Sequence, residues 1–219
     1  MNLLFRKIII ATTGLFLCIF LVVHLSANLI LLWPQDVSQP VYNAYSTFLR
    51  ENMLIKVVAY VLYISIILHI IYAALVGISN RRAKPKKYAM NKFLENSSWA
   101  SQNMGLLGLL ILLFLVVHLA NFWAKIKLGI GETAGTDIAG NVDVYQVAYA
   151  LFHNPFYVLF YSMLAIPLGF HLHHGLKSAF KTLGFYHKKG LSILSGFSLF
   201  YALLMCLGFG VIPIIVYFK

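Results

Sequence analysis

The chain has 219 residues, of which 61% are apolar and 11% are charged, and its formal net charge is +11. A soluble domain carries about 25% charged residues, so the composition excludes an ordinary soluble protein and indicates an integral membrane protein. The positive charge does not indicate nucleic-acid binding. Lysines and arginines cluster beside apolar stretches, at 81–92 and 177–189, where they suit cytoplasmic span ends and anionic lipid headgroups.

Five apolar stretches are long enough to cross a bilayer as helices, which takes about 20 residues each. The predicted spans are 8–33, 53–79, 101–126, 155–180 and 191–218. They leave only short connections, so residues 1–219 are predicted to form one membrane domain, with any soluble chemistry on partner subunits. Because the runs are too long for the strands of a membrane barrel, the predicted fold class is an all-α membrane protein.

The distribution of charge predicts the direction of each span. Arg6 and Lys7 place the N-terminus in the cytoplasm under the positive-inside rule. The basic connections 80–98 and 181–190 then lie on the cytoplasmic side, and the acidic connection 127–154 lies outside. The chain is therefore expected to be a multi-pass protein of the inner (cytoplasmic) membrane, with its C-terminus outside.

One hexapeptide occurs in both the first and the third span. Residues 20–25 and 114–119 read FLVVHL, and each copy places one histidine, His24 or His118, among apolar side chains. The repeat predicts that the first two spans resemble the next two. The expected architecture is a four-helix bundle with approximate two-fold symmetry and a fifth helix at its side.

Span two carries one histidine, His69, and span four carries three, of which His171 lies deepest in the predicted span. With a helical rise of about 1.5 Å per residue, His24 and His118 come late in outward spans and are expected in the outer half of the membrane. His69 and His171 come late in inward spans and are expected in the inner half. Small residues nearby, expected to let a flat ring approach the helix backbone, are Ala27, Gly77, Ala120 and Gly175.

A buried imidazole in lipid is costly unless it has a partner. A single one is usually a hydrogen-bonded packing residue, but four that pair by depth and by repeat favour a shared ligand. A metal held only by protein needs more ligands at one depth, and no Asp or Glu lies inside a predicted span. Haem needs only two axial ligands. The sequence therefore predicts two bis-histidine haems b within the four-helix bundle.

Other residues near the spans are predicted to contact the haem propionates, or the quinone that the family resemblance described below implies. His174, three residues after His171, is an alternative inner ligand or a contact of this kind. Arg81 and Lys177 are inner contacts, because basic groups complement carboxylates. Further candidates are Ser97, Arg82 and Gln102 at the inner side and Asn28, Tyr42, Tyr45, Arg50, Glu51, Asn121 and Trp123 at the outer side.

Residues 171–184, HLHHGLKSAFKTLG, together with one histidine in each of the first four spans, carry a family resemblance. The chain resembles the single-subunit, five-helix, di-haem cytochrome b anchor of succinate:quinone oxidoreductase and quinol:fumarate reductase. The resemblance implies that His24 and His118 hold the outer haem and that His69 and His171 hold the inner one. A carboxylate that some members carry beside the fourth-helix ligand is absent, since Phe170 and Leu172 flank His171.

The same resemblance implies the partners and the activity. An FAD-containing flavoprotein with the dicarboxylate site and an iron–sulfur subunit would dock on the cytoplasmic face, where 80–98 and 181–190 are candidate surfaces. Electrons would pass between the iron–sulfur clusters and a membrane quinone, expected to be menaquinone, through the two haems. The assembly would be respiratory complex II of the tricarboxylic acid cycle or its fumarate-reducing counterpart, and a higher oligomer of the complex is also an expectation.

Two alternatives remain open at this point. One is the cytochrome b subunit of another membrane reductase or of a hydrogenase, which would lack an FAD flavoprotein partner. The other is a proton-coupled transporter whose histidines relay protons, which would contain no haem and show no haem absorption.

Overall fold

The computed structural model describes residues 2–83, 98–131, 135–185 and 187–219. Within these residues the protein is helical, apart from one isolated β-bridge between Thr136 and Val142. The long helices are α1 (Leu3–Asn28), α3 (Met53–Ala83), α5 (Trp99–His118), α8 (Pro155–Thr182) and α9 (Lys188–Tyr217). The shorter elements are η1 (Leu29–Leu32), α2 (Gln35–Glu51), η2 (Leu119–Ala124), α6 (Lys125–Leu128) and α7 (Val144–Phe152).

The predicted all-α membrane fold with five spans is confirmed. In the described part of the chain, five helical stretches are long and apolar enough to cross a bilayer, and they coincide with the predicted spans to within a few residues. They are Leu3–Leu32, Met53–Arg82, Trp99–Leu128, Pro155–Thr182 and Gly190–Tyr217. Their large apolar side chains are widely exposed, as expected for helices that pack against lipid rather than water.

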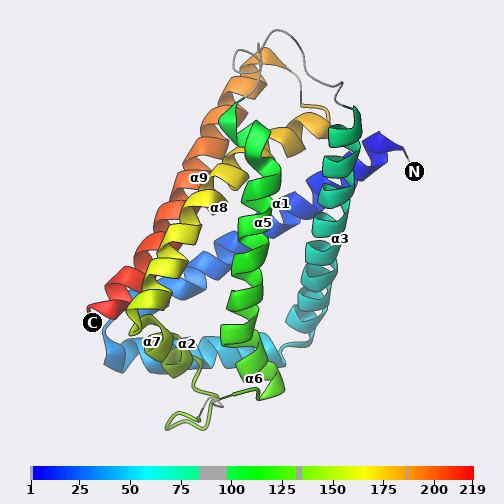
Figure 1. Cartoon of the computed structure of the whole chain (residues 1–219). Coiled ribbons are helices and arrows are strands. Elements are labelled where there is room, and N and C mark those ends of the chain that lie inside the picture. The colour runs from blue at the N-terminus through cyan, green and yellow to red at the C-terminus, as the bar shows by residue number, and fades with distance from the viewer. Residues whose placement is uncertain (1, 84–97, 132–134, 186) are drawn as a thin grey trace.

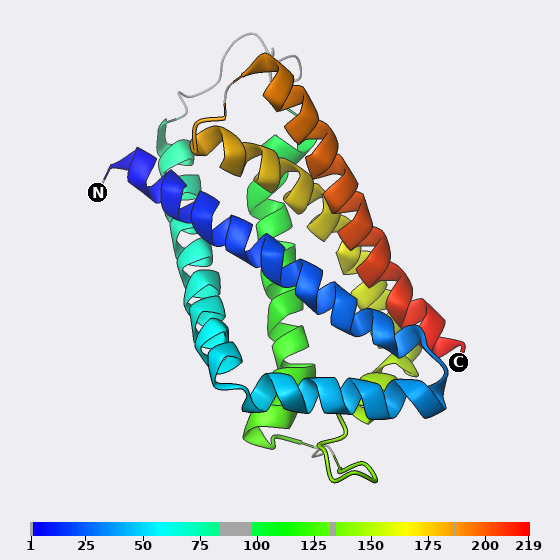
Figure 2. The same cartoon turned by 180° about the vertical axis from the view of Figure 1, so that it is seen from behind.

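The long helices run between two ends of the molecule (Figure 1). We name the end that carries α2 and α7 the outer end, and the end where α1 begins and α8 finishes the inner end, following the predicted topology. Helices α8 and α9 lie side by side at one edge, α3 stands at the other, and α5 stands between them. Figure 2 shows α1 running diagonally across the other helices to the outer end, where α2 lies across them.

Two helices outside the membrane spans were not predicted. The connections 34–52 and 127–154 contain α2 and α7, which pack on each other at the outer end. Helix α2 is polar enough to read as a loop, yet it buries Ser38 and Asn43 completely. Hydrogen bonds offset the cost of burying these polar groups. Asn43 Nδ2 donates to Asp143 Oδ1 at 2.9 Å, and Asn43 Oδ1 accepts from the Tyr145 backbone N–H at 2.9 Å.

Glycines set the closest approaches of the fifth long helix to its neighbours. A Cβ added to Gly208 of α9 would lie 2.8 Å from the methyl groups of Leu25 on α1. A Cβ on Gly169 of α8 would lie 3.0 Å from the Cβ of Cys206 on α9. Small residues at such crossings let helices pack tightly in lipid, where there is little hydrophobic driving force between them. Helix α9 is therefore bound to α1 and α8 at the side of the bundle, away from α3.

The two copies of the hexapeptide end differently. After His24, α1 finishes at Asn28 and tightens into the 3₁₀ turn η1. After His118, α5 widens into the π-helical segment η2, and such segments often occur beside functional sites. The asparagines of the two copies also differ, since Asn28 Nδ2 donates to the His24 carbonyl at 2.7 Å and Asn121 Nδ2 donates to the Tyr161 hydroxyl at 3.1 Å.

Candidate functional site

The structure brings His24 and His118 together. His24 lies on α1 and His118 is the last residue of α5, and their ring centroids are 5.7 Å apart with an interplanar angle of 84°. Each ring is stacked on the phenylalanine four residues earlier, Phe20 at 5.2 Å for His24 and Phe114 at 5.5 Å for His118. This outer pair is thus formed by the repeated hexapeptides themselves, with the first residue of each packing on its histidine.

Further aromatic side chains surround the outer pair. Phe209 of α9 lies 5.7 Å from the ring of His24, and Phe122 of η2 lies 5.1 Å from the ring of His118. Tyr161 of α8 lies 6.1 Å from His118. Five helical segments therefore close an apolar, aromatic environment around two imidazoles, which suits a large flat ligand better than a hydrated ion.

The structure also brings His69 and His171 together. His69 lies on α3 and His171 on α8, and their ring centroids are 6.4 Å apart with an interplanar angle of 66°. His174 lies one turn further along α8 and is half-buried. The helices therefore bring together the two histidines of the predicted inner pair, and His174 stays a predicted propionate or quinone contact.

Two glycines that the sequence analysis did not single out lie against this inner pair. A Cβ added to Gly14 of α1 would lie 3.2 Å from Cε1 and 3.6 Å from Nδ1 of His69, and one added to Gly108 of α5 would lie 3.9 Å from Cε1 of His171. The role predicted for Gly77 and Gly175, leaving room for a flat ring beside the helix backbone, stays a prediction. Among the described residues, no atom lies within 4 Å of a Cβ built on either glycine.

The glycines belong to the repeat, which is longer than six residues. Residues 14–25 read GLFLCIFLVVHL and residues 108–119 read GLLILLFLVVHL, so each copy has a glycine ten residues before its histidine. In both copies the glycine lies beside the inner pair and the histidine belongs to the outer pair. Ten residues of helix span about 15 Å, which is the approximate separation of the two pairs along α1 and α5.

Nδ1 of His69 differs from that of the other inner histidine in its hydrogen bonding. Thr13 Oγ1 of α1 lies 3.2 Å from Nδ1 of His69. Nδ1 of His171 and Nδ1 of His118 are buried, and neither has a hydrogen-bond partner among the described residues. A buried polar atom with no partner is costly, so the surroundings of His171 and His118 are incomplete in the described parts of the chain.

The donor set fits a haem better than a metal ion held by protein alone. In the described parts of the chain, no three histidine, cysteine or carboxylate side chains come together to hold a metal. Each pair offers two imidazoles and nothing else. With metal–imidazole bonds of about 2 Å, two axial histidines place their ring centroids roughly 6 Å apart, and the observed centroid distances are 5.7 Å and 6.4 Å.

Three of the remaining predicted contacts have defined surroundings. Lys177 Nζ donates to Ser195 Oγ at 3.3 Å and ties α8 to α9. Arg81, at the inner end of α3, extends toward α5, where its Nη2 would lie 3.8 Å from a Cβ on Gly105. At the outer end, Trp123 donates from its indole to the Tyr63 hydroxyl at 3.1 Å. Ser97 and residues 84–97 of the predicted docking surface lie outside the described residues.

Arg50 and Ser46 stand out at the outer end. They lie one turn apart on α2, and Nε of Arg50 and Oγ of Ser46 are buried with no hydrogen-bond partner among the described residues. The guanidinium keeps one bond, from Nη2 to Thr47 Oγ1 at 3.1 Å. Buried polar atoms are nearly always paired, so this turn of α2 is suited to a polar group from outside the chain.

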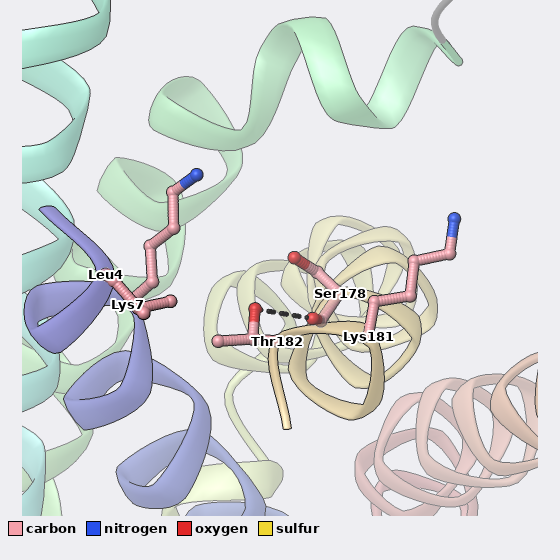
Figure 3. Close-up of a pocket in the computed structure, with 5 residues that line it drawn as sticks. All are labelled: Leu4, Lys7, Ser178, Lys181 and Thr182. Atoms are coloured by element: carbon pink, nitrogen blue, oxygen red, sulfur yellow. Dashed lines mark hydrogen bonds between the residues drawn. The ribbon is translucent and has the colours of Figure 1, made fainter. Parts of the chain in front are cut away.

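The inner end carries a basic cavity of about 210 Å³ between α1 and α8. Figure 3 shows Leu4 and Lys7 on one side of it and residues of α8 on the other, with the Thr182 hydroxyl donating to the Ser178 carbonyl at 2.9 Å. Lys181 completes the lining. Both lysines are exposed, so this surface is open to an acidic partner or to lipid headgroups.

No protein family model matches the chain, and neither a curated protein nor a solved structure matches it. The family resemblance thus remains a prediction from the residues. The structure shows, over the residues it describes, a helical protein with five candidate membrane spans that brings four histidines together in two pairs.

Proposed function

We propose that the chain is the di-haem cytochrome b that anchors a succinate:quinone oxidoreductase or quinol:fumarate reductase in the inner membrane. The observation that carries the proposal is the pairing of four histidines from four helices, His24 with His118 and His69 with His171. Two pairs about 15 Å apart along a helix suit a chain of two redox centres that crosses the membrane.

In this proposal each histidine pair holds one haem b by its iron. A bound haem supplies a one-electron centre whose potential the protein tunes. The chain's own residues hold and orient the ligands. Phe20 and Phe114 stack on the outer imidazoles, Gly14 and Gly108 leave room beside the inner ones, and the aromatic side chains exclude water.

The quinone is assigned to the outer end. Arg50 Nε and Ser46 Oγ are buried donors without a partner in the described chain, and a quinone carbonyl needs donors of this kind. Arg50→Leu is expected to raise the KM for quinone at least tenfold while two haems per chain are retained. An unchanged KM would remove Arg50 from the quinone site without affecting the haem assignment.

The soluble subunits are assigned to the inner end. An iron–sulfur subunit would dock there and bring with it the FAD flavoprotein that carries the dicarboxylate site. Lys7 and Lys181 line the open basic cavity at this end, and basic groups there would complement an acidic docking surface.

A pyridine haemochrome assay on the purified membrane complex, with protein quantified alongside, tests the proposal. Two haems b per chain and a co-purifying FAD flavoprotein are expected. One haem per chain would support a cytochrome b but would contradict the assignment of one haem to each histidine pair. No haem in freshly purified, folded protein would overturn the proposal and favour a proton-coupled transporter, whereas two haems without a flavoprotein would favour another membrane reductase.

A further inference from the structure

The two copies of the extended repeat differ at the residue before their glycine. Thr13 precedes Gly14 on α1, and Leu107 precedes Gly108 on α5. Both side chains are buried, with Thr13 8% exposed and Leu107 2% exposed. The difference coincides with the hydrogen bonding of the inner pair, because Nδ1 of His69 has Thr13 as a partner and Nδ1 of His171 has none in the described chain.

The direction of the Thr13–His69 hydrogen bond follows from counting protons. The Thr13 hydroxyl has one hydrogen, and its oxygen lies 2.6 Å from the Ile9 carbonyl of the preceding turn. A carbonyl can only accept, so the hydroxyl donates its hydrogen to Ile9. The same oxygen, 3.2 Å from Nδ1 of His69, is then left to accept. Nδ1 of His69 therefore carries the ring proton, and its Nε2 keeps the lone pair.

We infer that Thr13 is a positioning residue that prepares His69 as a haem ligand and lowers the reduction potential of the inner haem. The inference rests on the proposed function. A hydrogen bond from the distal N–H of a ligating imidazole fixes its tautomer and raises its basicity. A more basic ligand favours ferric over ferrous iron. Leu107 gives His171 no such acceptor. The two histidines proposed to hold the inner haem therefore differ in basicity because of a single position of the repeat.

Thr13→Val tests the inference, because it keeps a β-branched side chain and removes the Thr13 hydroxyl, leaving the Ile10 backbone as the other hydrogen-bond partner of His69. Loss of an outer-shell partner typically costs 10-fold or more in metal affinity. A tenfold loss confined to the ferric state would raise the midpoint potential of the inner haem by about 59 mV for one electron. The outer haem should keep its potential. Redox titration followed by optical spectra measures both, and the component that persists in His24→Ala identifies the inner haem.

Two matched variants separate this role from a structural one. Thr13→Ser keeps the hydroxyl and is expected to restore the wild-type potential. Thr12→Val changes the adjacent threonine, which is exposed and donates only to carbonyls of its own helix, and is expected to change neither potential. A shift in Thr12→Val equal to that in Thr13→Val would overturn the inference, because it would report a general effect on α1.

Leu107→Thr supplies the opposite test and does not depend on the folding of a Thr13 variant. It places a hydroxyl beside Gly108 and His171 in the position that Thr13 has beside Gly14 and His69. The midpoint potential of the inner haem is expected to fall. Wild-type protein without haem would overturn the proposed function and this inference with it. Bound haem whose inner potential is unchanged in both Thr13→Val and Leu107→Thr would overturn the inference alone.

Discussion

Gly14 of α1 lies directly against the imidazole of His69 on α3. A Cβ at residue 14 would stand 3.2 Å from Cε1 of that ring, closer than side chains normally approach. The contact explains why a glycine is needed in the middle of an apolar helix, where it costs about 1 kcal/mol relative to alanine. The imidazole ring occupies the space that a side chain at residue 14 would fill.

Gly14→Val is expected to displace His69 and to remove the inner haem while the outer haem is retained. The haem content should fall from two to one per chain in the pyridine haemochrome assay. Gly196→Val on α9 is the matched control, since this glycine is exposed and a Cβ there meets no described atom within 4 Å, and it should keep two haems. Retention of the outer haem shows that the Gly14 variant has folded. Two haems at wild-type affinity in Gly14→Val would contradict the contact.

His24→Ala should lose the outer haem, and His171→Ala should lose the inner haem. His24 faces His118 at the outer pair and His171 faces His69 at the inner pair, so each change leaves the other pair intact. Absorption spectra at low temperature and the haem-to-protein ratio measure the outcome. Loss of both haems from His24→Ala together with full retention in His171→Ala would contradict the pairing.

The coarse structure of this chain could be predicted from the hydropathy of its sequence and the rise of a helix. The five spans follow from apolar runs, and the partners of His24 and His69 follow from counting residues along helices of alternating direction. That count needs no knowledge of how the helices are rotated. The structure accordingly brings both predicted pairs together, while haem binding itself stays a prediction.

Contacts that depend on helix rotation and crossing were not predictable in the same way. Gly77 and Gly175 are near the inner histidines in sequence, yet a Cβ on either would meet no described atom within 4 Å, whereas Gly14 meets His69 from another helix. The signal for Gly14 and Gly108 was present, because the repeat extends back to both glycines. Helix α2 was missed for a different reason: its polar composition resembles a loop, and its burial depends on Asn43 meeting Asp143, a hundred residues away.

Asn43→Ala should destabilise the outer end. The buried amide donates to Asp143 and Asp137 and accepts from the Tyr145 backbone N–H. Its removal would leave that N–H without this acceptor, although Asp143 would keep its bonds from Gln39 and Gln146. The expected cost is about 1–3 kcal/mol, measured by thermal unfolding in detergent. Asn103→Ala is the control, because among the described residues the Asn103 side chain donates to the Trp99 carbonyl of its own helix at 2.9 Å and to no other group. Equal destabilisation by the two changes would argue against a special role for Asn43.

Asp137 should make the stability of the outer end depend on pH. Desolvation pushes the pKa of the Asp137 carboxyl upward, but hydrogen bonds to the carboxylate outweigh this effect and hold the pKa below its usual value of 3.8. The donors are the backbone N–H groups of Asn141 and Ala139 and the side-chain amides of Asn43 and Asn141. A lowered folded-state pKa stabilises the protein above the unfolded pKa, and this stabilisation is lost as pH falls through the folded pKa. Asp137→Asn should therefore show a smaller decrease in Tm below about pH 4 than wild type. Parallel Tm curves for the two proteins would exclude this contribution.

Charge reversal at the basic cavity should weaken the docking of the soluble subunits. Lys7 and Lys181 line this cavity at the inner end from two different helices, so Lys7→Glu with Lys181→Glu would place two negative charges where an acidic surface is proposed to bind. The expected result is at least a tenfold lower yield of co-purified flavoprotein per haem, with wild-type binding more sensitive to salt because exposed charges are screened. Lys127→Glu, an exposed lysine of α6 at the outer end, is the control and should leave the yield unchanged. A normal yield from the double variant, at low and at high salt, would move the docking surface away from this cavity.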